Sequence, residues 1–200
     1  MMPFSGGKVH EKKMTRYFAK YLEHSSMGTL WVKALQVGWR GMYPTRPEID
    51  IMWGSKRGLD RCPPVTAAEI KYFSAPFERV PSPPPYYSGV DEALALLLFG
   101  IDHSVLIHLV DSHLMGSYLR SLEVTRLMIK SLHLPIGYRV YKIIRRDDNV
   151  VFKTKALVGE QLMDLEKLWI DPPPNPSLDV PQVQKNREVL FKQLRISKFC

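Results

Sequence analysis

Two carboxylates and one ammonium group occur at a spacing that suits a divalent metal ion and a phosphodiester. Asp50 lies in the run R-P-E-I-D-I-M-W, and Glu69 and Lys71 lie in the run A-A-E-I-K-Y-F. Carboxylate oxygens are the ligands that Mg²⁺ and Mn²⁺ prefer, and these ions complete their coordination with water and phosphate oxygens. A neighbouring lysine can orient or help to deprotonate the attacking water and offset charge in the transition state. We therefore predict a hydrolytic site at these three residues.

Both runs have the pattern of short β-strands. Apolar residues surround the charged ones at positions 49, 51, 53, 68, 70, 72 and 73. Residues i and i+2 of a strand share a face, so Glu69 and Lys71 should point to the same side. The stretch 54–64 contains Gly and Pro and can reverse the chain, which would place Asp50 beside them on the neighbouring strand. The alternative is an ordinary half-exposed β-hairpin that carries surface charges.

In these residues the chain resembles the PD-(D/E)xK nuclease superfamily, in which an Asp on one strand is followed by Glu-x-Lys on the next. The leading Pro-Asp is loosened here to Pro47-Glu48-Ile49-Asp50, whereas Glu69-Ile70-Lys71 matches the pattern. The resemblance implies that Asp50, Glu69 and the Ile70 carbonyl bind Mg²⁺ or Mn²⁺ while Lys71 positions the attacking water. It also implies hydrolysis of DNA, with RNA not excluded and the choice between endo- and exonucleolytic cleavage open.

A helix is predicted from about Lys8 to His24, because Met14, Phe18 and Leu22 recur at intervals of four residues. Glu11 precedes Met14 by three residues and should lie at the edge of the same face. Members of the superfamily often carry a glutamate on the first helix, so the resemblance implies that Glu11 helps to hold the metal or its water. The alternative is an acidic residue in the first turn, which the helix dipole favours.

The same helix carries a row of cations. They recur every four residues and should form one stripe, which consists of Lys8, Lys12, Arg16 and Lys20. Nucleic-acid phosphates could lie along this stripe, or it could be an ordinary solvated face.

The remaining elements extend the resemblance. A strand is predicted in 28–40, a proline-rich loop in 76–85, and an apolar strand in 103–111. Between the last two, Ser88 as N-cap and Asp91 suggest a capping box that opens a buried helix, which Gly100 ends. The order α-β-β-β-α-β over residues 8–112 predicts an α/β fold with a restriction-endonuclease-like core, in which helices flank a mixed central sheet.

Two further sets of residues lie near the predicted site. The superfamily often places a Gln or Tyr at the start of the second helix, where this chain has no Gln but has Tyr86, Tyr87, Asp91 and Glu92. We expect Tyr87 to contact substrate and leave the auxiliary role unassigned. Histidines recur every five residues at 103, 108 and 113; this interval alternates between the two faces of a strand, so we expect structural roles for them.

The rest of the chain predicts a helix over 117–133, a β-hairpin over 136–157, and a short helix over 159–169. We therefore expect one domain over 1–170, followed by a proline-rich linker and a closing helix over 171–200. The hairpin is basic, which suits either nucleic acid or an exposed sheet edge that resists aggregation. Its cations are Arg139, Lys142, Arg145, Arg146, Lys153 and Lys155.

Composition narrows the partners. The 200 residues carry a formal charge of +8, which favours a polyanion such as DNA. Two cysteines without a C-x-x-C motif suggest a reducing, intracellular setting and no secretion, and no apolar stretch is long enough to cross a bilayer. A homodimer is possible by analogy with the superfamily. The alternative function is a nucleic-acid-binding or assembly protein that keeps the nuclease fold without turnover.

Overall fold

A computed structural model describes residues 7–25, 29–34, 49–55, 64–74, 87–146 and 149–193, without the side chains of residues 7–10, 29–34, 55, 146, 149 and 193. The predicted proline-rich loop over 76–85 lies outside the described residues. Within them the fold is mixed α/β, and one sheet has the strand order β1-β2-β3-β4-β5-β6. The pairs β3/β4 and β4/β5 are parallel, and the other pairs are antiparallel. The strands are β1 (Thr29–Ala34), β2 (Ile51–Ser55), β3 (Val65–Phe73), β4 (His103–Asp111), β5 (Gly137–Arg146) and β6 (Asn149–Lys153).

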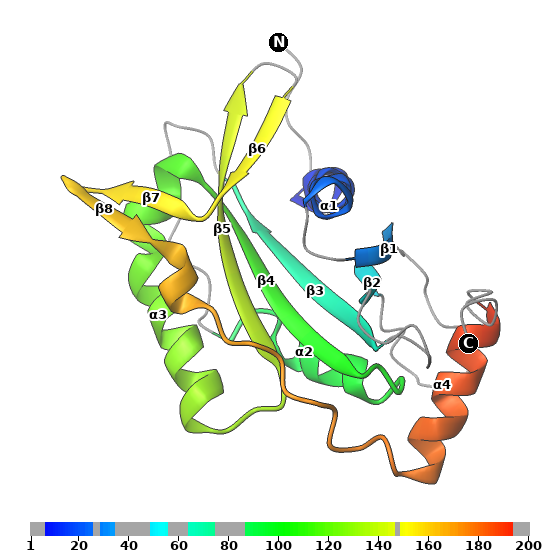
Figure 1. Ribbon diagram of the computed structural model, residues 1–200. Coiled ribbons are helices and arrows are strands. Elements are labelled where there is room, and N and C mark those ends of the chain that lie inside the picture. The colour runs from blue at the N-terminus through cyan, green and yellow to red at the C-terminus, as the bar shows by residue number, and fades with distance from the viewer. Residues whose placement is uncertain are drawn as a thin grey trace.

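Helices cover the two faces of this sheet (Figure 1). On one face, α1 (Gly7–His24) packs Met14, Phe18 and Leu22 against the even-numbered residues of β3 and the odd-numbered residues of β4. On the other face, α2 (Val90–Leu97) and α3 (Met115–Ser131) share a core with Leu106 and Val110 of β4. β4 is therefore buried on both faces, which explains why its sequence is mostly apolar and does not alternate between apolar and exposed polar residues. The expected order of helix, three strands, helix and strand is confirmed.

The start of α2 differs from the predicted capping box. The N-cap is Gly89, whose φ is 81°, and no side chain caps the helix. Glycine suits this left-handed conformation because it has no Cβ. The Ser88 carbonyl accepts a hydrogen bond from His108. The prediction of Ser88 as N-cap is therefore wrong, and the backbone of this turn is held by a neighbouring strand.

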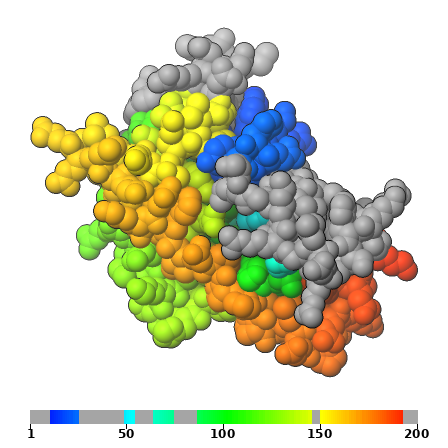
Figure 2. Space-filling view, viewed as in Figure 1, coloured from blue at the N-terminus to red at the C-terminus, as the bar shows by residue number. Residues whose placement is uncertain are grey.

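The predicted helix over 159–169 is also wrong. Its residues form part of a second, two-stranded sheet, β7 (Lys155–Val158) and β8 (Gln161–Asp164), and a 3-10 turn, Leu165–Leu168. Gly159 has a φ of 60° and begins the two-residue turn between the strands, the place where tight hairpins require glycine. This hairpin projects from the body of the molecule (Figures 1 and 2).

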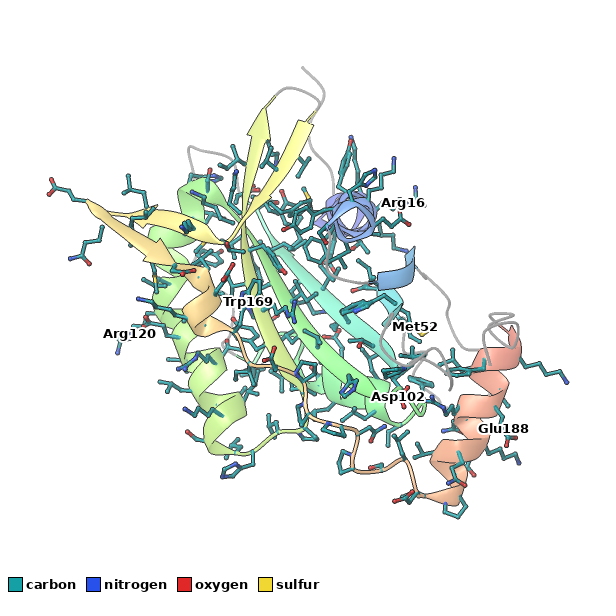
Figure 3. All side chains as sticks on the ribbon, in the orientation of Figure 1. Arg16, Met52, Asp102, Arg120, Trp169 and Glu188 are labelled. Carbon is teal, nitrogen blue, oxygen red and sulfur yellow. The ribbon has the colours of Figure 1, made fainter. Side chains whose placement is uncertain are left out.

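The C-terminal segment packs across the end of the sheet that carries β2. The buried side chain of Asn175 donates hydrogen bonds to the carbonyls of Leu97 and Ile101, both 2.8 Å. It is followed by α4 (Pro181–Gln193), close to the predicted closing helix, and Leu190 of α4 joins a core that includes Met52. Figure 3 labels Met52 and Asp102 at this end of the sheet. None of the helices in the described ranges has the length and apolarity needed to span a bilayer.

Candidate active site

Asp50 and Glu69 lie opposite each other where β2 begins. Ile51 pairs with Ala68 in the antiparallel ladder. Asp50, directly before β2, therefore faces Glu69, the residue after Ala68 on β3. Directly opposite residues of an antiparallel pair point to the same side. The Asp50 carboxylate also accepts a hydrogen bond from the backbone N–H of Ile70, with an Oδ2 to N distance of 2.8 Å. The predicted proximity of the two carboxylates is therefore present in the structure.

The Ile70 carbonyl faces the same region. The N–H and C=O of one strand residue point toward the same neighbouring strand. Because the Ile70 N–H points to Asp50, the Ile70 carbonyl is directed to the β2 side as well. The side chain of Ile70, in contrast, is fully buried in the core beneath α1. Ile70 can therefore offer the site only its backbone.

Lys71 connects β3 to α2. Its Nζ lies 2.8 Å from a carboxylate oxygen of Glu69 and 2.8 Å from a carboxylate oxygen of Glu92. The Lys71 and Glu69 side chains are 18% and 8% exposed, whereas the Glu92 side chain is 49% exposed. Glu92 is therefore a further member of this group, to which the sequence assigned no role. Its place in the first turn of the predicted helix was the available signal.

All of these groups lie on the face of the sheet that α2 covers. In the parallel ladder, Glu69 pairs with Leu106 and Lys71 pairs with His108. Leu106 belongs to the core shared with α2 and α3. The alternation of the strand therefore sends Glu69 and Lys71 to the side opposite α1.

Burial and repulsion shape the charges of the site. Burial, followed by the nearby Asp50 carboxylate, raises the pKa of Glu69 to about 8, although Lys71 opposes the change. For Lys71, burial lowers the pKa, but attraction to Glu69 and hydrogen bonds to Glu69 and Glu92 outweigh it and raise the pKa above its ordinary value. Lys71 is therefore protonated at neutral pH, which favours the role of an orienting cation over that of a base.

The carboxylate pair suits a hard divalent cation. Among the described residues, no group of three or more His, Cys, Asp or Glu side chains is arranged to hold a metal ion. Mg²⁺ does not need such a cage, since it is commonly bound by one or two carboxylates together with waters and substrate phosphates. A cation between Asp50 and Glu69 would relieve the repulsion that raises the pKa of Glu69. The donor atoms therefore fit Mg²⁺ or Mn²⁺.

Glu11 and the cation stripe lie on α1, which covers the face of the sheet opposite Glu69 and Lys71. The Glu11 carbonyl accepts a hydrogen bond from Thr15 Oγ1 within the helix. Lys12, Arg16 and Lys20 are exposed, and each lies two residues before a member of the buried row, about 200° around the helix. The stripe therefore points away from the sheet; Figure 3 labels Arg16 on α1. The side chain of Lys8 lies outside the described residues.

Tyr87 stands at the surface beside the site. Its side chain is 58% exposed, and its carbonyl accepts a hydrogen bond from the N–H of Val90, the first residue of α2. Tyr87 therefore lies on the turn that leads to Glu92, in a position from which it can meet a substrate.

The basic hairpin β5–β6 is partly neutralised. Arg139 stacks over Trp169 at 4.8 Å and lies 3.8 Å from Asp171, and Arg145 forms a 2.6 Å ion pair with Asp111. Lys142 and Lys153 face each other across the ladder. The Arg146 side chain lies outside the described residues. Arg139 and Arg145 are thus engaged in ion pairs, whereas Lys142 and Lys153 form a like-charged pair.

In comparisons with protein-family models, curated proteins and solved structures, nothing matched this chain. Its function must therefore be inferred from the geometry of Asp50, Glu69, Lys71 and Glu92.

Proposed function

We propose that this chain is a metal-dependent nuclease of the PD-(D/E)xK type that hydrolyses DNA phosphodiester bonds. The observation that carries the proposal is a buried Glu69 opposite Asp50, with Lys71 on the same face and two residues further along β3. The order of helix, three strands, helix and strand supports a restriction-endonuclease-like core around these residues. The charge of +8 suits a polyanionic substrate.

Asp50, Glu69 and the Ile70 carbonyl would hold Mg²⁺ or Mn²⁺. When bound, such an ion acidifies a water molecule and offsets charge on the phosphoryl oxygens. Lys71 stays protonated, so it orients the attacking water and stabilises the negative charge that develops at phosphorus. Glu92 holds the Lys71 ammonium from the α2 side. The role of Glu11 in holding the metal remains a prediction from the resemblance. The arrangement of Asp50, Glu69, Lys71 and Glu92 does not require it.

Substrate enters this scheme from the side of Tyr87 and Glu92, which are the exposed members of the site. Tyr87 can stack on a base or contact the backbone. The stripe of Lys12, Arg16 and Lys20 would bind phosphates of the same substrate further away. A homodimer, which the resemblance suggests by analogy, would double this charged surface.

The experiment is a cleavage assay with Mg²⁺ or Mn²⁺ on linear, circular, single-stranded and branched DNA, with RNA included. We expect cleavage by the wild type and a loss of at least about 100-fold in Asp50→Asn, Glu69→Gln and Lys71→Met. Glu123→Gln, which neutralises an exposed carboxylate of α3, is the matched control and should cleave normally. Full activity of the folded Lys71→Met protein would refute the mechanism.

One observation favours the alternative, a nucleic-acid-binding protein without turnover. The exposed cations of α1 lie on the sheet face opposite Glu69 and Lys71, so DNA could bind there without meeting the carboxylates. Thermal unfolding separates the two cases. A melting temperature that rises with Mn²⁺, and no longer rises in Asp50→Asn, supports the nuclease, because a ligand of the native state raises stability. Salt-sensitive DNA binding with no response to Mn²⁺ supports the alternative.

A further inference from the structure

The aliphatic stem of Lys71 lies directly on Gly89. A Cβ atom at position 89 would lie 2.9 Å from Cγ and 3.0 Å from Cε of Lys71, which is closer than ordinary van der Waals contact allows. The φ of 81° at Gly89 also disfavours every L side chain. The turn that precedes α2 is therefore the surface against which the lysine rests. Glu92, three residues later on α2, holds the other end of the same side chain.

His108 fixes this turn to the sheet. Its Nε2 lies 3.1 Å from the Ser88 carbonyl and its Nδ1 lies 2.9 Å from the Tyr138 hydroxyl. A carbonyl can only accept, so Nε2 carries the proton and donates, and Nδ1 accepts from Tyr138. The imidazole is 2% exposed, and its ring meets Phe73 and Tyr138 edge to face, with centroids 5.0 and 5.2 Å away.

His108 remains neutral in this setting. Burial lowers its pKa to about 4, and the positive charge of Lys71 contributes in the same direction, while the bond to Ser88 opposes them. A neutral imidazole with both nitrogens occupied has one tautomer and one orientation. The Ser88 carbonyl is therefore held at a fixed place relative to β4.

These contacts connect Lys71 to His108 through the start of α2. On β4, His108 is the residue in register with Lys71 of β3. His108 binds the Ser88 carbonyl, the next residue Gly89 contacts the Lys71 stem, and Glu92 of α2 binds the Lys71 ammonium. Each link is a direct contact between buried or half-buried groups. A shift of the turn would move both the surface beneath the lysine stem and the carboxylate that holds its tip.

We propose that His108, oriented by Tyr138, is a positioning residue for Lys71. It acts through the Ser88–Gly89 turn and touches neither substrate nor metal. The expected effect on catalysis rests on the proposed function, whereas the effect on the Lys71 side chain does not. A purely structural histidine would lower stability without moving the lysine.

Two variants and a control test this inference. His108→Phe keeps a ring between Phe73 and Tyr138 and removes both hydrogen bonds. His108→Gln keeps a side-chain N–H that can reach the Ser88 carbonyl. The control is Ser104→Ala, because Ser104 is also a fully buried polar residue of β4 and bonds an α2 carbonyl, that of Ala93, without approaching Lys71.

The first readout is NMR of the metal-free protein, which needs no nuclease activity. In the wild type we expect a nuclear Overhauser effect between the Lys71 ε-methylene and the Gly89 α protons, and a slowly exchanging ¹H–¹⁵Nζ signal from Lys71. Both should disappear in His108→Phe and persist in His108→Gln and Ser104→Ala. Unchanged signals in folded His108→Phe, or their equal loss in Ser104→Ala, would overturn the inference.

The second readout is cleavage kinetics. We expect kcat to fall about 10- to 100-fold in His108→Phe with KM nearly unchanged, since misplacing a catalytic group by about 1 Å has effects of this size. His108→Gln should recover most of the rate. If the wild type cleaves no substrate, the proposed function fails while the NMR result still decides the positioning. If His108→Phe does not fold, Tyr138→Phe replaces it, and wild-type NMR signals in that variant would overturn the role of Tyr138.

Discussion

The charge on Glu69 should make the metal-free protein less stable as the pH rises toward 8. The pKa of this carboxyl rises from an ordinary value of 4.5 to about 8 in the folded chain, because of burial and the Asp50 charge. The folded state therefore binds more protons than the unfolded state between these two values. Stability is lost as the pH rises through this range, and the loss is complete above the folded pKa.

The size of the effect follows from the same two values. Each pH unit in the range costs at most about 1.4 kcal/mol, so the whole interval from 4.5 to about 8 sets an upper limit of about 5 kcal/mol. The titration of His108 has the opposite effect on stability. Its folded pKa of about 4 lies below the ordinary 6.5, so the free energy of unfolding rises with pH between about 4 and 6.5. Between pH 6.5 and 8 the expected loss from Glu69 is about 2 kcal/mol. The Asp111 carboxyl, whose pKa burial raises to about 7, and the end of the unfolded-state titration of His108 act in the same window, so the Glu69 part is measured as the difference between the wild type and a variant without this carboxyl.

The assay is urea denaturation of the wild type and Glu69→Gln at pH 6.5, 7, 7.5 and 8 without divalent cations. Glutamine keeps the shape and removes the titration, so the difference in unfolding free energy between the two proteins should grow by about 2 kcal/mol in favour of the variant. Mn²⁺ should abolish this growth of the difference between the two proteins. A difference that stays constant from pH 6.5 to 8 would show that the pKa of Glu69 is not raised into this range and would refute the argument.

Three more predictions concern the turn, the closing helix and the charged stripe. Gly89→Ala should destabilise the fold by about 1–3 kcal/mol, because φ is positive there and the new Cβ meets the side chains of Leu106 and Lys71; an unchanged denaturation midpoint would contradict this. Asn186→Ala should cost about 1–3 kcal/mol, because the fully buried amide donates to the Leu98 carbonyl, and hydrogen exchange should quicken in α4 before it does in β4. Replacing the three exposed cations of the stripe by Gln should weaken DNA binding. The slope of the logarithm of the binding constant against the logarithm of the salt concentration should become less steep by up to about 0.9 for each phosphate that the protein no longer neutralises. An unchanged slope would show that the stripe does not contact DNA. These cations are Lys12, Arg16 and Lys20.

The sequence was sufficient to predict the meeting of Asp50, Glu69 and Lys71, because strand periodicity is local. An interval of two fixes a shared face, and an antiparallel return brings the opposite residue to the same side. The metal-binding role of Glu11 stays a prediction that local periodicity cannot decide. Helical periodicity placed it at the edge of the buried row, but only tertiary packing decides which face of the sheet the helix covers.

Glu92 and His108 could not be assigned roles for a related reason. Their contacts depend on how α2 leaves the sheet, and that is set by the left-handed Gly89 and by the hydrogen bond from β4. The sequence pattern favoured Ser88 as the N-cap, because serine is a common capping residue. In the structure, the hydrogen bond from His108 to the Ser88 carbonyl fixes the turn, and Gly89 is the N-cap. The helix predicted at 159–169 failed because Gly159 supplies a tight turn that interrupts an otherwise helical composition.

The division of charge between the two faces of the sheet limits how a nucleic acid can bind. Glu69 is nearly buried, whereas Glu92 and Tyr87 are about half exposed or more, so among the described residues the approach to Lys71 is open on the α2 side. The stripe on α1 lies beyond the other face. A DNA strand that contacted both would have to pass around the edge of the sheet. If the chain is the proposed nuclease, we therefore expect cleavage of long substrates, but not of short ones, to depend on the stripe.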